Sequence, residues 1–150
     1  MDFIKEIKQN KVHKDMLKIF NNKDILFLEN GQSHQNCDGN LEIWLIENKI
    51  RYNSLYNISK LPLEYVKNQI EYYDIIAFQT TWTYEISKTL EEYISKLENR
   101  KVIVECYINE PSWNYKPKVI HDVYILNSFG DDMDDWTFDK LRTNKPYWEK

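Results

Sequence analysis

The stretch that decides the fold is residues 74–108, where DIIAFQT (74–80) is followed by YEISKTLEEYISKLE (84–98) and KVIVECYI (101–108). The first and third segments are short apolar runs, typical of strands that are covered on both faces of a sheet. The middle segment is expected to be a helix, because its apolar residues recur at helical spacing: Ile86, Leu90, Tyr93, Ile94 and Leu97. Strand, helix and strand in this order predict a βαβ unit with a parallel pair and a right-handed crossover.

Four more segments are expected to extend this unit. Apolar spacing predicts helices over residues 2–21 and 61–73, and short apolar runs predict strands over residues 24–29 and 119–126. A length of 150 residues, 42% of them hydrophobic, is typical of one domain with a substantial core. We therefore expect a single α/β domain over residues 1–150. Helices would pack on a mixed sheet of about five or six strands, and α+β is the alternative class.

Residues 41–53 are expected to form a β-hairpin. The apolar run 41–47 and the shorter run 49–53 are separated by a turn at Asn48, a residue type that tolerates positive φ. Apolar side chains fall on both faces of the first run, so we expect it to be covered on both sides. If this strand lay at an edge of the sheet, it could pair with another chain.

Charge and composition exclude several classes of protein. The formal charge is -4, and the chain has only three arginines, Arg51, Arg100 and Arg142. Arginine is preferred for bidentate recognition of phosphate and guanine, so a general nucleic-acid binder is disfavoured. Two cysteines in 150 residues cannot form a disulfide scaffold.

The sequence also bears on location and on cofactors. The N-terminal 20 residues carry charges throughout and lack the apolar region of a signal peptide. No segment approaches the roughly 20 apolar residues that cross a bilayer, so we expect a cytoplasmic protein without membrane contact. Glycine occurs only at positions 31, 39 and 130, which excludes both a dinucleotide-binding fingerprint and a P-loop. With no HExxH, CxxC or EF-hand pattern either, we expect no cofactor and no metal.

The first candidate site lies in the polar loop 30–40. His34 and Cys37 are three residues apart, with Asp38 beside them. A thiol and an imidazole at this spacing can act as nucleophile and base, or supply two ligands to a metal ion. Two ligands do not hold a zinc ion, and a polar loop without a site is the competing interpretation.

The second candidate site follows from the predicted βαβ unit. Ligands of α/β sheets bind outside the carboxyl ends of the parallel strands. Here those ends carry Thr80 and Thr81 after the first strand, and Glu105 and Glu110 at the end of the second. Hydroxyls and carboxylates suit a nucleotide or a sugar. If the protein is an enzyme, a glutamate of this group would supply the acid or base, but a helix cap at the threonines explains them equally well.

The third candidate site is the acidic, aromatic tail. Residues 128–150 are expected to pack on the domain as a turn followed by a short helix. Within the tail, an acidic and aromatic group is expected to bind a partner: Asp131, Asp132, Asp134, Asp135, Trp136 and Phe138. Apolar residues in a negative field can anchor a basic protein. Two alternatives remain: a solvated turn with Trp136 packed on the core, and an oxygen-rich site for a divalent cation, although the EF-hand spacing is missing.

Two functions are therefore carried forward. The first is a small acidic interaction protein, such as an inhibitor of the immunity or antitoxin type that binds a basic protein. The second is a small enzyme or ligand-binding domain that takes a nucleotide or sugar at the strand ends. The absence of any catalytic signature favours a protein that is not an enzyme. Nothing in the sequence indicates an oligomeric state.

Overall fold

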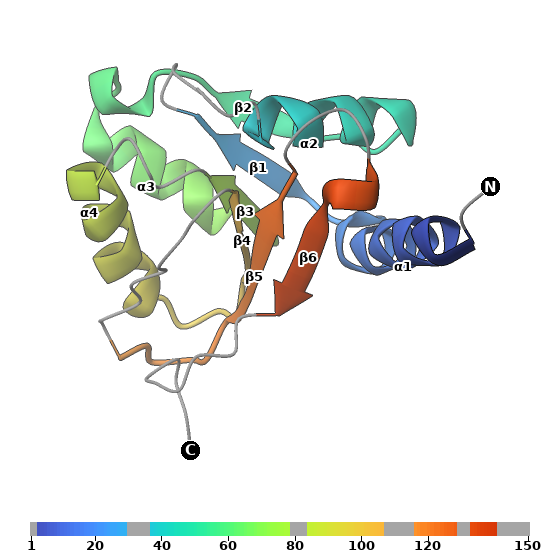
Figure 1. Ribbon diagram of the computed structural model, residues 1–150. Helices are drawn as coiled ribbons and strands as arrows, with labels where there is room; N and C mark the ends of the chain where they lie inside the picture. Colours follow the sequence, from blue (N-terminus) through green and yellow to red (C-terminus); the bar gives the residue numbers. More distant parts are fainter. Residues whose placement is uncertain (1–2, 30–36, 79–83, 107–115, 129–132, 141–150) are drawn as a thin grey trace.

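A computed structural model describes residues 3–29, 37–78, 84–106, 116–128 and 133–140 of the chain (Figure 1). In these residues the α-helices are α1 (Phe3–Phe20), α2 (Cys37–Glu47), α3 (Leu63–Glu71) and α4 (Tyr84–Ser95). The strands are β1 (Ile25–Leu28), β2 (Asn53–Leu55), β3 (Ile75–Phe78), β4 (Val102–Cys106), β5 (Asp122–Asn127) and β6 (Thr137–Lys140). Two 3-10 helices, η1 (Ile58–Lys60) and η2 (Met133–Asp135), complete the described elements.

The strands form one mixed sheet in the order β2-β1-β3-β4-β5-β6. The first five strands of this order are parallel, and β6 runs antiparallel to β5. The predicted α/β class and mixed sheet are confirmed. The βαβ unit is confirmed as well, because β3 and β4 are parallel neighbours with Ile75 beside Val102, and α4 connects them.

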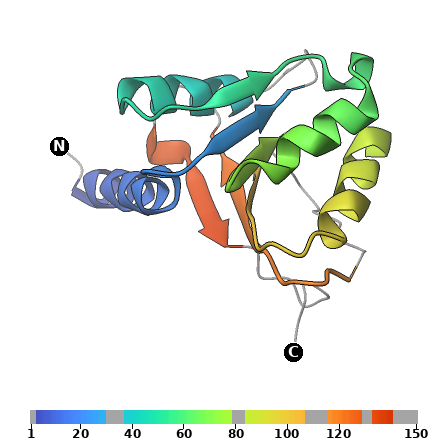
Figure 2. The ribbon, with the colours of Figure 1, turned by 180° about the vertical axis from the view of Figure 1, so that it is seen from behind.

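Helices cover both faces of this sheet (Figure 2). Met16 and Phe20 of α1 and Trp44 of α2 are buried in one apolar cluster against Ile25 and Phe27 of β1. A second apolar cluster lies on the opposite face, where α3 and α4 pack on β1, β3 and β4. Its members include Leu26, Leu28, Ile76 and Ile103 of the strands and Val66, Ile70, Leu90 and Ile94 of the helices. The side-chain period of two along a strand separates the two clusters.

The predicted hairpin over residues 41–53 is wrong. Residues 41–47 belong to the helix α2, and the residues that α2 buries are Leu41, Trp44 and Leu45, which are spaced as on one helical face. The following strand β2 is parallel to β1, so the chain must cross over between them, and a helix makes this crossover. The residue with positive φ in the turn is Lys49, at 58°, rather than its neighbour Asn48.

The C-terminal part of the described chain adds an antiparallel edge to the sheet. The strand expected over 119–126 is present as β5, and residues 137–140 form β6 beside it rather than a helix. Trp136 and Phe138 are buried in the cluster beneath α1, and the Phe138 ring stacks on Tyr124 with a centroid distance of 5.0 Å. No helix of the described residues is long and apolar enough to span a membrane.

Buried polar contacts hold α3 and α4 against the strands at the amino end of the sheet. The Lys101 ammonium donates hydrogen bonds to the carbonyls of Glu71 and Tyr73 at 2.9 and 2.6 Å, which satisfies acceptors at the end of α3. His121, 2% exposed, accepts a hydrogen bond from the Lys101 backbone N–H at 2.9 Å, and its other ring nitrogen lies 3.1 Å from the Ile94 carbonyl. Both ring nitrogens are thus engaged in holding α4 to the strands.

Candidate functional site

The strand order changes direction between β1 and β3. The chain leaves β1 through α2 toward β2 at one side of the sheet, and leaves β3 through α4 toward β4 at the other side. The two helices also cover opposite faces. In doubly wound sheets this reversal is where ligands bind, outside the carboxyl ends of the strands. Functional groups are therefore expected at this edge of the sheet, which includes the carboxyl ends of β4 and β5.

Two helices begin at the same edge. The helices α2 and α4 start at Cys37 and Tyr84, after the strands β1 and β3. A helix N-terminus presents free backbone N–H groups and the positive end of the helix dipole. Their positions on either side of the reversal favour the binding of a negatively charged group there.

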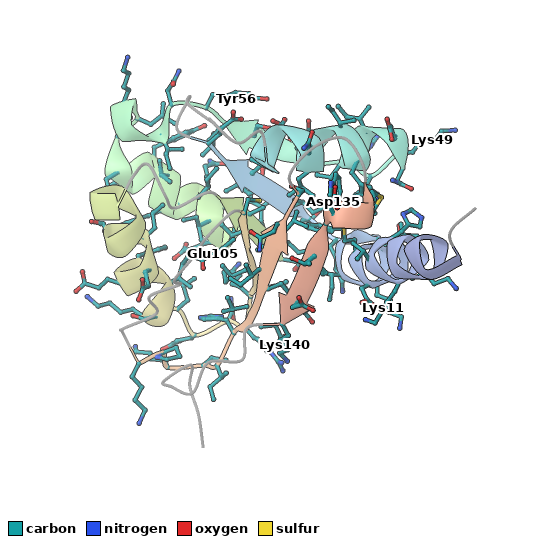
Figure 3. The ribbon with its side chains drawn as sticks, in the orientation of Figure 1. Lys11, Lys49, Tyr56, Glu105, Asp135 and Lys140 are labelled. Carbon is teal, nitrogen blue, oxygen red and sulfur yellow. The ribbon has the colours of Figure 1, made fainter. Side chains whose placement is uncertain are left out.

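Glu105 is the buried carboxyl group of this edge. It lies one residue before the end of β4 and is 3% exposed. Its strand neighbours are Phe78 on β3 and Ile125 on β5. Alternation along the strand places it with Ile103 on the face that α3 and α4 cover, and Figure 3 shows it on that side of β5. A carboxylate offers about four acceptor positions, so it can receive a ligand hydroxyl in addition to its contacts within the protein.

Asn40 and Ser128 connect α2 to the end of β5. Both residues are buried, and the Asn40 amide donates a hydrogen bond of 2.7 Å to the Ser128 carbonyl. Ser128 directly follows β5, while Asn40 lies in the first turn of α2. The contact therefore fixes the start of α2 over the carboxyl ends of the strands.

A second polar group lies on the β2 side. The hydroxyls of Tyr52 and Tyr56 both donate to Oε2 of Glu42 on α2, at 2.7 and 3.2 Å. Burial, together with the hydrogen bond to Glu42, raises the pKa of Tyr52 well above its ordinary value, so its hydroxyl stays a donor. Tyr56 directly follows β2 and is exposed (Figure 3). At the end of β1, Oε2 of Glu29 is buried.

Of the residues predicted at the strand ends, Glu105 lies where it was expected. Thr80, Thr81 and Glu110 fall outside the described residues, as does His34 of the polar loop. Cys37 and Asp38 form the start of α2, which places the backbone of both at the same edge of the sheet.

The residues predicted in the acidic tail separate into three groups. Asp131 and Asp132 lie outside the described residues, whereas Asp134 and Asp135 form η2, with Asp135 exposed. Trp136 and Phe138 are 4% and 6% exposed and belong to the core, so their side chains are covered by the protein itself.

Several residues of this edge could not be predicted from the sequence. Asn40 and Ser128 are 88 positions apart, and Glu42 and Tyr52 lie within the predicted hairpin over 41–53, which the structure replaces with α2 and β2. Asn40 and Ser128 meet only in the folded chain, so no local sequence pattern predicts their contact. A helical interpretation of residues 37–47 would have placed Glu42 on the side of α2 that meets β2.

A cavity of about 540 Å³ lies at the opposite end of the sheet. It is lined by Glu71, Tyr72, Lys96, Leu97, Glu98, Asn99 and Lys101. Its buried cation, the Lys101 ammonium, is already bound by two carbonyls. Burial lowers the pKa of Lys101, because the cost of desolvating the ammonium outweighs the attraction of the nearby carboxylates. The hydrogen bonds of Lys101 to the two carbonyls leave this ammonium engaged within the protein.

Comparisons with protein-family models, with curated proteins and with solved structures give no significant match. No relative therefore supplies a function for the chain. Within the described residues, no group of three or more His, Cys, Asp or Glu side chains is arranged to hold a metal ion.

Proposed function

We propose that the chain is a ligand-binding domain that takes a nucleotide or a sugar at the carboxyl ends of its parallel strands. The observation that carries the proposal is the reversal of strand order between β1 and β3. In doubly wound sheets this position is the general ligand site, whatever the chemistry that follows.

The chemistry of the edge supports this class of ligand. The starts of α2 and α4 favour an anionic group such as a phosphate. Glu105 accepts hydrogen bonds from ligand hydroxyls, and a solvent-excluded carboxylate makes stronger hydrogen bonds than one in water. Tyr56 offers an exposed aromatic ring on the β2 side, where a base or sugar face can stack. A nucleotide or a phosphorylated sugar has both kinds of group.

A panel of nucleosides, nucleotides and sugars tests the proposal by thermal unfolding. A ligand present at 100 times its dissociation constant stabilises the fold by about 2.7 kcal/mol. In a domain of this size, that raises the melting temperature by about 5–10 °C. We expect a nucleotide or sugar phosphate to produce this shift, and the Glu105→Gln variant to bind at least tenfold more weakly, about 1.4 kcal/mol.

Glu91→Gln is the matched control. Glu91 is also a buried glutamate, 7% exposed, but it lies in the second half of α4, away from the start of that helix. Its variant should bind the ligand as the wild type does. The proposal fails if no compound shifts the melting temperature at millimolar concentration, or if Glu91→Gln and Glu105→Gln weaken binding equally.

A further inference from the structure

The outer face of α2 exposes two isoleucines. Ile43 and Ile46 are 55% and 62% exposed, and residues three apart lie on the same side of a helix. The buried face of α2 is filled by Leu41, Trp44 and Leu45, so the two isoleucines contribute nothing to the core. Single exposed apolar residues are ordinary, whereas two neighbours beside a cavity are typical of a binding surface.

A cavity of about 260 Å³ lies beside Ile43, between α2 and η2. It is lined by Asn40, Ile43, Trp44, Glu47, Met133 and Trp136. This volume is below the roughly 300–1,000 Å³ of sites for small ligands. It suits one apolar side chain from a partner, which would contact Met133 and Ile43.

The elements around the cavity are acidic. In sequence, neither α2 nor η2 has a basic residue. Glu47 lines the cavity, whereas Glu42 lies on the side of α2 that meets β2 and accepts hydrogen bonds from Tyr52 and Tyr56. Asp135 is exposed on η2, and Lys49 extends from the far end of α2 (Figure 3). In a symmetric dimer formed through this face, the acidic residues of one copy would lie against the same acidic residues of the other. Repulsion between these like charges disfavours such a dimer.

We propose that the surface formed by α2 and η2 docks a basic amphipathic helix of a partner protein. One apolar residue of that helix would enter the cavity, another would cover Ile46, and lysines or arginines would face Glu47 and Asp135. This is helix-in-groove recognition, in which apolar anchors supply affinity and complementary charge supplies orientation. The cavity shares Asn40 with the carboxyl edge of the sheet. The contacts proposed here are made by Ile43, Ile46, Glu47 and Asp135, so neither proposal depends on the other.

The test uses three synthetic 16-residue peptides against the full chain labelled with ¹⁵N. The first is an amphipathic helix of leucine and lysine, the second replaces its lysines with glutamate, and the third replaces its leucines with serine. We expect only the first to bind, with chemical-shift changes confined to α2 and η2. Its affinity should fall severalfold between 50 and 300 mM salt, as screening of exposed charges requires.

Variants test which residues are responsible. Ile43→Ser combined with Ile46→Ser should weaken binding of the leucine–lysine peptide at least tenfold, and Asp135→Lys should weaken it at low salt. The matched controls are Ile120→Ser, at an isoleucine that is 39% exposed, and Glu98→Lys, at a side chain that is 85% exposed. Both controls should bind as the wild type does, because neither residue belongs to α2 or η2.

Three results would overturn the proposal. The first is that the leucine–lysine peptide causes no shifts in α2 or η2. The second is that the lysine–serine peptide binds equally well, which would mean that charge alone is recognised. The third is that sedimentation shows a dimer that Ile43→Ser with Ile46→Ser dissolves, which would mean that a second copy covers this face.

Discussion

Replacement of Trp136 by alanine should strongly destabilise the protein. Trp136 is 4% exposed and lies in the cluster with Phe20 and Phe138. An aromatic side chain buries about 150–250 Å², and at about 25 cal/mol per Å² this corresponds to about 4–6 kcal/mol. Truncation of buried Phe or Trp to Ala generally costs about 3–5 kcal/mol. We therefore expect a loss of about 4 kcal/mol in the free energy of unfolding, out of a total of about 5–15 kcal/mol for domains in general.

The assay is guanidinium denaturation followed by far-UV circular dichroism. The midpoint should fall while the slope of the transition stays the same, since the surface exposed on unfolding hardly changes. Tyr72→Ala, at an aromatic residue that is 75% exposed, is the control and should change stability by no more than about 0.5 kcal/mol. If the alanine variant has no folded baseline, Trp136→Phe should show a smaller loss in the same direction. A loss below about 1 kcal/mol for Trp136→Ala would refute the core position of this side chain.

Three further predictions concern buried polar groups. Lys101→Met removes two hydrogen bonds to carbonyls at the end of α3 and should cost about 2 kcal/mol in urea denaturation; an unchanged midpoint would contradict it. Burial lowers the pKa of His121 in the folded protein. As the pH falls, the unfolded chain therefore takes up a proton at this histidine before the folded protein does, and the free energy of unfolding should fall below about pH 6.5. His121→Gln should flatten that dependence. Burial and the hydrogen bond to Glu42 raise the pKa of Tyr52 in the folded protein. The contribution of this residue to the free energy of unfolding is therefore complete below about pH 10 and decreases above that pH. The difference in stability between the wild type and Tyr52→Phe should accordingly become smaller above about pH 10.

The sequence predicts the fold well where one face of each element is clearly apolar. The unit from β3 to β4 could be recognised because Leu90 and Ile94 fall at helical spacing between two continuous apolar runs. The strand order could not be predicted in the same way. It depends on β2 lying outside β1, and β2 has only three residues, of which Asn53 is exposed.

The helix α2 was misinterpreted for a physical reason. Its buried residues Leu41, Trp44 and Leu45 have helical spacing, but the exposed Ile43 and Ile46 fill the opposite side. A helix that is apolar on both sides resembles a strand that is covered on both faces. The exposed isoleucines that obscured the helix are the same residues that we propose contact a partner.

The candidate site was only partly predictable. Glu105 could be found because the end of a parallel strand is a general location for ligands. The contact of Asn40 with Ser128 could not be found, since the two residues are 88 positions apart and meet only when the sheet has formed. The tail was identified as acidic and aromatic, yet its Trp136 is buried, because β6 continues the sheet and carries that segment into the core.

Mapping of ligand contacts by NMR tests the central claim most directly. The ¹⁵N-labelled chain is titrated with adenosine monophosphate and with glucose 6-phosphate, and the shifts of backbone amides are followed. We predict that one of them shifts the amides of Glu29, Asn40 and Glu105 at the carboxyl edge, in a saturable way. Shifts confined to the cavity around Lys96 and Lys101 at the opposite end, or no shifts at millimolar ligand, would contradict the proposed function.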